Sequence, residues 1–355
     1  MSDCPIQLDG DGTVQVNDHA LVTEIARDDR TFSSAVSRFL QVPNGMDGKY
    51  HTAFRALVDR YLSPRRVAEL QAGTRQLAEE VVAEAVAGSN AIDAVELGAQ
   101  FAVRGSCAWL GWPRELEAEL LRWVHANFAA TRSGELEKTA EVARWYNEII
   151  TSLLKFRREH PTDDVTTELM QDRSLGRALT DEEITSILRN WTGGDLGTMA
   201  QCVGVVVAYL ADNPHLQQRL RTGVSDAEWQ AVLDEIMRLD DPFMASRRVA
   251  TRDVTVGDTQ VQAGQRLRLN WTAANQDPEV FGEQRFDPAG HAEFNLVWGT
   301  GRHACPGRDL GTMQLRELIQ ALLAATRMIE PAMDGARVRS EPPAGGYDSV
   351  PVWLN

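Results

Sequence analysis

The feature that most constrains the fold of this 355-residue chain is a long segment without proline in its middle. The segment opens on Thr180-Asp-Glu-Glu183, where a threonine and a glutamate three residues later form a capping box, the pattern that starts a helix. The next proline is Pro214. A helix over the roughly 33 residues between them is ~50 Å long at about 1.5 Å per residue, enough to cross a whole domain. The sequence therefore predicts one domain-crossing helix over 181–213.

Further helix signals lie on both sides of this segment. Ser63 followed by Pro64 is typical of a helix start and predicts a helix over 64–87. A second capping box, Ser225-Asp-Ala-Glu228, predicts a helix that ends near Leu239. Short hairpin strands are expected over 254–256, 261–262 and 266–269, a last amphipathic helix over 307–326, and an edge strand over 350–353. The predicted class is mainly α with a small β-sheet region.

Composition excludes several classes of protein. There are 36 basic and 51 acidic residues, and a net charge of −15 argues against a general nucleic-acid or anionic-membrane binder. The N-terminal residues lack the basic and apolar regions of a signal peptide, and the longest apolar run, Cys202 to Ala211, is about half a bilayer span. We therefore expect a soluble, cytoplasmic protein. The four cysteines form no Cys-x-x-Cys pair, which argues against a zinc site or disulfide scaffold.

The segment from Trp298 to Gly307 carries the most chemical information. Two glycines before Cys305 and one after it make a tight loop that leads into a helix. A cysteine at a helix N-terminus has its thiolate favoured by the helix dipole, and Arg302, His303 and Arg308 add positive charge nearby. These conditions favour a stable thiolate ligand. A lone cysteine is more often a small, buried apolar residue, so the assignment needs further marks.

This loop resembles the haem-binding loop of the cytochrome P-450 family, Phe-x-x-Gly-x-x-x-Cys-x-Gly, with Trp298 in place of the phenylalanine. The resemblance covers about residues 20–355, and it implies the cytochrome P-450 fold in a single haem domain over 1–355. It also implies haem b as cofactor, with Cys305 as the iron ligand and Trp298, Gly299 and Gly307 around it. Indole adds an N–H donor, so we hypothesise a hydrogen bond from Trp298 that weakens the electron donation of the thiolate; simple aromatic packing is the alternative.

Other family marks follow in the expected order. Glu235-Ile-Met-Arg238 matches the family's Glu-x-x-Arg, a structural pair, because residues i and i+3 share one face of a helix. His51-Thr-Ala-Phe-Arg55 resembles its His-x-x-x-Arg, whose side chains donate to a haem propionate. The resemblance assigns the remaining cofactor contacts to Arg248 (with Arg247 as the neighbouring alternative), His303 and Asn270.

The predicted helix over 181–213 resembles the family's distal helix, which usually carries Ala/Gly-Gly-x-Asp/Glu-Thr over the haem. Counting back from Pro214 aligns Thr198 with the family's alcohol, but the acid position just before it is Gly197. Asp195 lies three residues before Thr198, on nearly the same face. We expect Thr198 and Asp195 to be catalytic, with Asp195 delivering protons in place of the missing acid. The alternative for Asp195, a solvated polar residue, is equally consistent with the sequence.

The front of the chain departs from the family pattern as well. The first helix and first strand of the family are expected to be largely absent, which gives a shortened N-terminus. Only about eleven residues separate Phe32–Ser34 from Met46–Asp47, a short version of the loop that usually covers the substrate. The pocket is then either more open or closed by helices in 110–160. Candidate substrate contacts, chosen by position, are Trp191, Gly194, Met244 to Ser246 (including Ala245), Tyr347 and Phe39 to Val42.

The resemblance implies a monooxygenase that inserts one oxygen atom from O2 into a small organic substrate. No flavin or iron–sulfur segment is recognisable, so we expect electrons from a separate ferredoxin and its reductase, with no nucleic-acid or membrane partner. A local basic patch is expected at the thiolate side, made of Arg60, Arg65, Arg66, Arg302 and Arg308. Two alternatives stay open: a peroxide-using or atypical haem-thiolate oxidase, suggested by Gly197, and a non-enzymatic haem-binding sensor.

Overall fold

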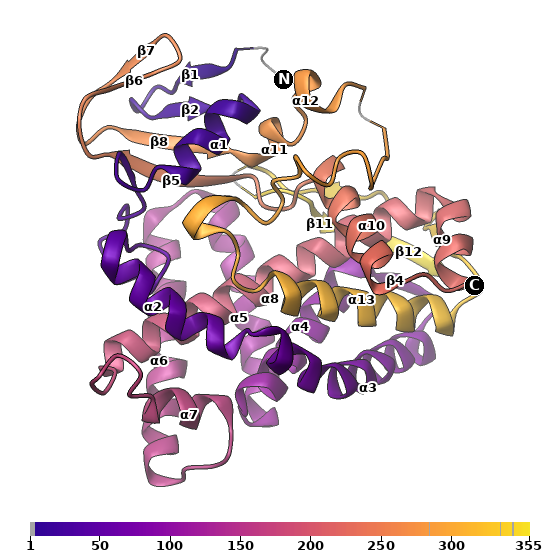
Figure 1. Ribbon diagram of the computed structural model, residues 1–355. Coiled ribbons are helices and arrows are strands. Elements are labelled where there is room, and N and C mark those ends of the chain that lie inside the picture. Colours follow the sequence, from indigo (N-terminus) through magenta and orange to yellow (C-terminus); the bar gives the residue numbers. More distant parts are fainter. Residues whose placement is uncertain (1–3, 284, 334, 343) are drawn as a thin grey trace.

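The computed structural model of the protein describes residues 4–355 except 284, 334 and 343. Helices make up most of it, and the largest sheet lies at one end of the molecule (Figure 1). The helices are α1 His19–Arg27, α2 Gly48–Tyr61, α3 Pro64–Gly88, α4 Ala94–Leu110, α5 Glu117–Ser133, α6 Leu136–Glu159, α7 Val165–Gln171, α8 Asp181–Asp212, α9 Pro214–Arg221, α10 Asp226–Leu239, α11 Trp271–Ala274, α12 Pro278–Phe281 and α13 Arg308–Ala325. The strands are β1 Ile6–Leu8, β2 Val14–Val16, β3 Phe32–Ser33, β4 Ala91–Asp93, β5 Ala245–Ala250, β6 Val254–Val256, β7 Thr259–Val261, β8 Arg266–Asn270, β9 Ile329–Pro331, β10 Val338–Arg339, β11 Tyr347–Ser349 and β12 Pro351–Leu354.

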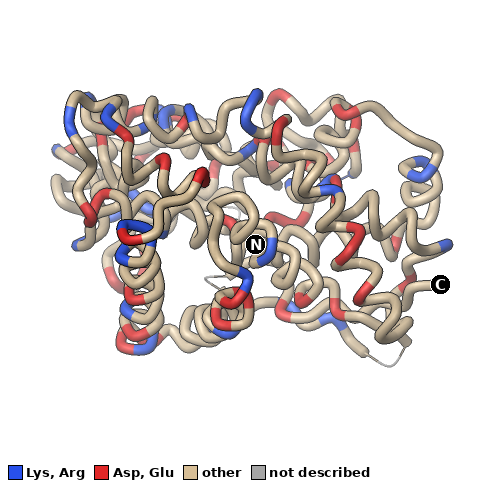
Figure 2. Tube along the Cα trace, turned by 90° about the horizontal axis from the view of Figure 1, so that it is seen from below, with Lys and Arg blue, Asp and Glu red and all other residues tan. Residues whose placement is uncertain are grey.

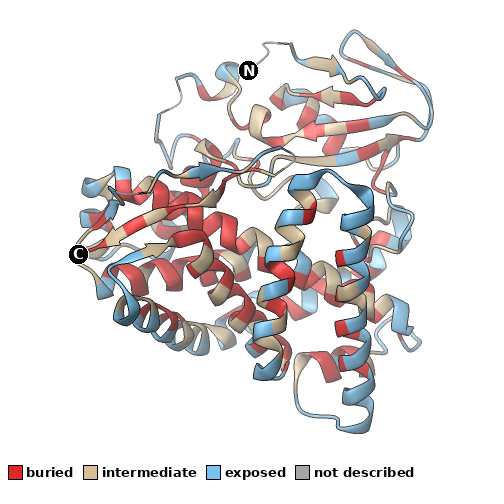
Figure 3. Cartoon of the chain, turned by 180° about the vertical axis from the view of Figure 1, so that it is seen from behind, coloured by how far each residue is buried: buried red, intermediate tan, exposed pale blue. Residues whose placement is uncertain are grey.

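Helix α8 is the long helix predicted from the capping box. Thr180 Oγ1 accepts a hydrogen bond from the Glu183 N–H at 3.2 Å, and the Glu183 carboxylate accepts one from the Thr180 N–H at 2.8 Å. The helix is long and apolar enough to pass as a membrane span, but 72% of its most apolar window is buried inside the fold. It is therefore the central core helix, and buried residues gather where other helices meet it (Figure 3).

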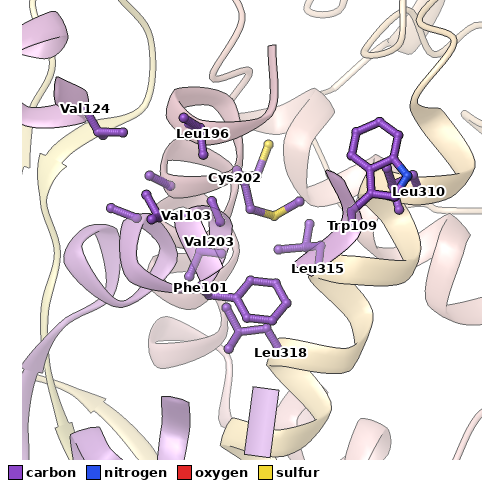
Figure 4. Close-up of a cluster of buried hydrophobic side chains, with 14 of the residues drawn as sticks. Phe101, Val103, Trp109, Val124, Leu196, Cys202, Val203, Leu310, Leu315 and Leu318 are labelled. Carbon is purple, nitrogen blue, oxygen red and sulfur yellow. The ribbon is translucent and has the colours of Figure 1, made fainter. Parts of the chain in front are cut away.

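The core is densest where α4 and α13 pack with α8. Glycine permits the close approach of α4, because a Cβ placed on Gly98 would lie 2.9 Å from the Ala200 Cα. Phe101, Leu196, Leu315 and their neighbours fill the space between these helices (Figure 4). One wall of the cavity described below is therefore built on rigid, close-packed elements.

The largest sheet has five strands in the order β1-β2-β8-β5-β3. Only β2 and β8 pair in parallel within it; the other neighbours are antiparallel. The predicted hairpin is present as β6–β7, with Gly257 at φ +52° in its turn. Strand β5 carries Arg248 from this sheet toward the helical part of the molecule (Figure 1).

Two expectations about the chain ends need correction. The first strands of the main sheet are present as the β1–β2 hairpin, so the expected absence of the first-strand region is wrong. Residues 4–18 contain no helix. The predicted edge strand over 350–353 is β12, which lies between β4 and β9 and is therefore a central strand. Its Pro351 is tolerated there because it is the first residue of the strand.

The second predicted capping box is only half formed. Ser225 Oγ accepts from the Glu228 N–H at 3.2 Å and begins α10 as predicted. The Glu228 carboxylate instead accepts a hydrogen bond from Arg219 Nε at 2.7 Å. In a complete capping box the Glu228 carboxylate would accept from the Ser225 N–H, but here it is bound by an arginine of the neighbouring helix α9.

Candidate active site

The loop before α13 presents Cys305 to a large cavity. Gly299 and Gly301 adopt left-handed backbone angles, with φ +68° and +72°, and a Cβ on Gly301 would lie 2.7 Å from the Ala26 carbonyl oxygen. The Cys305 N–H donates to the Trp298 carbonyl oxygen at 2.8 Å, which closes the loop. The Cys305 thiol is open to the cavity. The loop therefore offers a sulfur ligand from a fixed backbone.

Burial nevertheless dominates the acidity of this thiol. Desolvation raises the pKa of Cys305, and the Gly307 N–H and the charges of Arg55 and Arg308 lower it only partly. The N–H groups at the start of the helix and the nearby cations thus lower the pKa, as the sequence predicts, while desolvation raises it. A bound metal ion changes this balance, because coordination deprotonates a thiol outright.

The cavity has a volume of about 610 Å³, and its lining joins the Cys305 loop to α8, β5, α13 and the loop over 34–45. Of the predicted contacts, Trp191, Gly194, Ala245 and Ser246 line it, together with Asp195 and Thr198. Tyr347 is not among the described lining residues: it is buried beside Gln201, whose Oε1 accepts from the Tyr347 N–H at 2.9 Å. Of the predicted segment 39–42, only Gln41 lines the cavity, since Val42 is buried and Phe39 points to solvent.

A buried cation lies at the rim of the cavity. Arg248 is only 6% exposed, and its Nη1 donates to the Arg247 carbonyl oxygen at 2.8 Å and to Ser246 Oγ at 3.5 Å. No carboxylate lies within ion-pair distance of it in the described part of the chain. Burial lowers the pKa of Arg248, and a buried charge without a counter-charge is costly. An anionic group from outside the protein would therefore fit beside it.

His303 lines this rim, and the buried His51 lies beside it, outside the described lining residues. The His303 and His51 rings lie 4.3 Å apart, centroid to centroid. His303 Nε2 is buried without a hydrogen-bond partner among the described residues, and Asp47 Oδ1 is 3.7 Å away. Burial, with the nearby His51 and Arg248, lowers the pKa of His303 to about 4. A neutral ring N–H and a buried guanidinium are suitable donors for carboxylates, so the residues present fit haem propionates beside a Cys305-bound iron.

Two predicted cofactor contacts are placed differently. Arg55 Nη1 donates to the carbonyl oxygens of Arg302 and Ala304, at 2.9 and 2.8 Å, so it holds the cysteine loop from below. Asn270 is not among the described cavity-lining residues. It is the N-cap of α11, accepting from the Ala273 N–H at 3.1 Å, and a cofactor contact is not supported.

The predicted Glu235–Arg238 pair is buried behind the cysteine loop. Arg238 is 0% exposed and donates to both Glu235 oxygens, at 2.8 and 2.9 Å. Burial alone would raise the pKa of Glu235, but hydrogen bonds from Arg238, from the Asp287 N–H and from His291 hold it below its ordinary value. Sequence reasoning missed His291 and Asn275, whose carbonyl oxygen accepts from Arg238 at 2.6 Å. No spacing rule links positions that are 37 and 56 residues away.

Asp195 on α8 is the residue for which the sequence left two alternatives open, a proton donor and a solvated polar side chain. Asp195 Oδ2 accepts a hydrogen bond from Ser106 Oγ of α4 at 2.7 Å, and the carboxyl also bonds the Gln314 side chain of α13. Burial raises its pKa from 3.8 to about 6. Asp195 is therefore not a freely solvated side chain. Ser106 and Gln314 were not predicted.

The position before Thr198 is tight for the acid that the family usually carries there. A Cβ added to Gly197 would lie 3.3 Å from the ring of Phe128 on α5. A carboxylate at this position would have to displace that ring. Gly197 thus allows the Phe128 ring to pack closely against α8.

Trp298 uses its indole N–H elsewhere than the sulfur. Nε1 donates to Asp234 Oδ1 at 2.6 Å, and the other Asp234 oxygen accepts from Arg308 Nη2 at 2.7 Å. The hypothesis that this N–H donates to the thiolate is wrong, because an anionic acceptor on α10 binds it. The ring packs over Gly311, where a Cβ would lie 3.3 Å from it, as the aromatic-packing alternative requires.

The expected basic patch is largely neutralised. Each of its five arginines pairs with a carboxylate: Arg60 with Asp172, Arg65 with Glu69, Arg66 with Glu168, Arg302 with Asp29 and Arg308 with Asp234. Seen from below, basic and acidic residues are interspersed along the chain trace (Figure 2). The patch therefore carries little net positive charge.

A cysteine thiol open to one cavity, an alcohol on a core helix and buried donors at the rim are the arrangement expected of a haem-thiolate enzyme. Residues 123–332 match the family model described as Cytochrome P450, and the chain belongs to this family. It is therefore an oxidoreductase of the cytochrome P450 monooxygenase type, and the family implies a haem-iron cofactor. The predicted fold class is confirmed.

Individual relatives cover nearly the whole chain. A putative cytochrome P450 126 of Mycobacterium tuberculosis is 29% identical over 91% of this chain and 84% of its own length. A 2-hydroxy-5-methyl-1-naphthoate 7-hydroxylase of Streptomyces carzinostaticus is 27% identical over 87% of this chain and 76% of its own. The structure of open EryK from S. erythraea superposes with a TM-score of 0.89 at 23% identity, covering 99% of this chain and 93% of that one.

Proposed function

We propose that residues 1–355 form a single haem b domain that inserts one oxygen atom from O2 into a small organic substrate. The observation that carries the proposal is the shared cavity, which brings Cys305, Thr198 and the unpaired Arg248 to one lining. Bound haem with a thiolate ligand supplies the oxygen-activating chemistry. We further propose that the enzyme works in the cytoplasm.

Each residue then has a defined task. Cys305 ligates the iron, while Arg248, His303 and His51 bind the propionates through charge-assisted hydrogen bonds. The Thr198 hydroxyl orients a water in the cavity, and the Asp195 carboxyl gives up and regains a proton. Trp191, Gly194, Ala245 and Ser246 bound the space left for substrate, which is apolar with a few polar groups.

Replacing Thr198 by alanine tests this account of the distal side. The variant is expected to consume electrons with much less product per electron, because no hydroxyl orients the water. Thr198→Ser, which keeps the hydroxyl, is the matched control and should stay coupled. Full coupling in Thr198→Ala would refute the role of Thr198.

The electron source is proposed to be a separate ferredoxin with its reductase. Because the arginines on the cysteine side are paired, we expect the ferredoxin to dock through shape complementarity and local side-chain contacts rather than through long-range charge attraction. Added salt should therefore slow electron transfer only weakly. Gly197 favours one rival, a peroxide-using enzyme. Product formed with hydrogen peroxide, and none with a reduced ferredoxin, would favour that rival.

The names of similar proteins suggest a class of substrate. A hydroxylase of a naphthoate and steroid C26-monooxygenases are among the similar proteins. We propose a ring-containing apolar substrate, and a panel of naphthoates and steroids tests it through the spin-state change of the haem spectrum on binding. A response only to acyclic ligands would contradict the proposal.

A further inference from the structure

The Asp195 carboxyl is held by side chains from two other helices. Ser106 Oγ of α4 donates to Oδ2 at 2.7 Å, and Gln314 of α13 bonds the same carboxyl. Ser106 is 0% exposed and Gln314 is 2% exposed. Three polar side chains from α4, α8 and α13 thus meet beside the cavity, which Asp195 and Gln314 line.

Their surroundings are otherwise apolar. Trp109 of α4, Leu196 of α8 and Leu315 of α13 belong to the apolar cluster that joins the same three helices (Figure 4). A carboxyl in such a place costs free energy of folding unless it is hydrogen-bonded. In the part of the chain that is described, no arginine, lysine or histidine lies within ion-pair distance of Asp195, so the group is not part of a structural salt bridge.

The hydrogen bonds available to the carboxyl suit both of its protonation states. Ser106 Oγ and the Gln314 amide can donate to a carboxylate and so lower its pKa, against the effect of burial. Gln314 Oε1 is buried and has no partner among the described residues. A buried amide oxygen without a partner is a site for an ordered water beside the carboxyl.

We propose that Ser106 and Gln314 are positioning residues that hold Asp195 as a proton store, resupplied from the α4–α13 side through a water on Gln314 Oε1. The inference rests on the proposed function of Asp195 as the proton donor. The neutral acid gives its proton to a water in the cavity, and the resulting carboxylate is stabilised by the two donors. A proton from bulk solvent, passed on by the water on Gln314, then restores the acid and leaves that water neutral. This route replaces the one through position 197, where Phe128 occupies the space.

The pH dependence of stability tests the positioning without requiring turnover. A raised pKa means that the folded state keeps the Asp195 proton longer than the unfolded chain does. The contribution of Asp195 to the free energy of unfolding therefore falls as pH rises from about 4, and levels off above about 6. Asp241, whose pKa burial raises to about 7, adds a separate component that the Ser106 and Gln314 variants should leave in place. Removing a donor destabilises the carboxylate, so Ser106→Ala and Gln314→Leu should each move the levelling point up by about one to two pH units.

Thermal unfolding of the holoenzyme across pH measures these points. Ser106→Thr keeps the hydroxyl and should restore the wild-type profile. Thr166→Val removes a hydroxyl that is equally buried but bonds Leu110 and Trp112 rather than a carboxyl, so it should leave the pH profile unchanged. Asp195→Asn should abolish this component, and neither Ser106→Ala nor Gln314→Leu should alter the profile further in that background.

The same variants, measured for product formed per electron across pH, connect the cluster to catalysis. The upper limit of efficient coupling should move by the same number of pH units as the stability profile. Unmoved profiles in both single variants, or equal shifts in the Asp195→Asn background, would overturn the positioning role. Shifts in stability with no shift in coupling would instead uphold the positioning and refute Asp195 as proton donor.

Discussion

At the scale of single residues, the active site is defined by groups that lack partners within the protein. Among the described residues, the buried guanidinium of Arg248 has no carboxylate within ion-pair distance, and the buried Nε2 of His303 has no hydrogen-bond partner, with Asp47 Oδ1 3.7 Å away. Native proteins rarely leave such groups unsatisfied. Both are explained if the cofactor's carboxylates belong to the folded structure.

Replacing Arg248 by leucine should therefore lower haem retention. We expect the haem-to-protein ratio after gel filtration to fall several-fold, because the propionates lose a buried charged donor. Arg247→Leu is the comparison variant, since Arg247 also lines the cavity but is exposed where Arg248 is buried. Full haem retention in Arg248→Leu, or equal loss in both variants, would contradict the assignment.

Trp298→Phe should leave the reduction potential of the haem unchanged. The indole N–H is bound by Asp234, so its loss removes no hydrogen bond from the sulfur. Stability should fall by about 1–3 kcal/mol, because Asp234 is left with one fewer donor. Redox titration and urea unfolding measure the two effects, and a clear change in potential would show that the indole acts on the sulfur after all.

At the scale of elements, local signals predicted α3, α8 and the start of α10, because proline and capping residues act within one turn. The Cys305 loop and the Glu235–Arg238 pair were predictable for a related reason, since each is a short motif. The order of strands around β12 was not, because it depends on pairing with β4, more than 250 residues earlier in the chain. The Ser106–Asp195 bond spans 89 residues and has no sequence signal.

The contact between α5 and α8 can be tested at Gly197. Gly197→Asp should destabilise the protein by about 1–3 kcal/mol, because the new side chain overpacks against Phe128. The same change made in a Phe128→Ala background should cost much less, since the ring has been removed. Urea unfolding of the four proteins gives the coupling free energy. If the effects of Gly197→Asp and Phe128→Ala on the free energy of unfolding were additive, the Phe128 ring would not be what limits the space at position 197.

At the scale of the whole molecule, one end holds the mixed sheet and the rest is built around α8 (Figure 1). The cavity lies where these parts meet, so strand β5, the cysteine loop and α8 each contribute one part of its lining. The net charge of −15 is reflected in the pairing of the arginines near the cysteine loop, which leaves little basic surface there. The family resemblance indicated which segments form the site. The pairing of the arginines could be seen only in the fold, because most of their carboxylate partners are far away in the sequence.

The central claim is that Cys305 sulfur is the axial ligand of a haem in this cavity. The absorption spectrum of the reduced carbonyl complex tests it most directly, because a thiolate ligand moves the Soret band strongly to the red. The account predicts this band in the wild-type protein and its loss in Cys305→Ala, with Cys202→Ala as a control that keeps it. A wild-type complex without the red-shifted band, or a Cys305→Ala complex that retains it, would contradict the account.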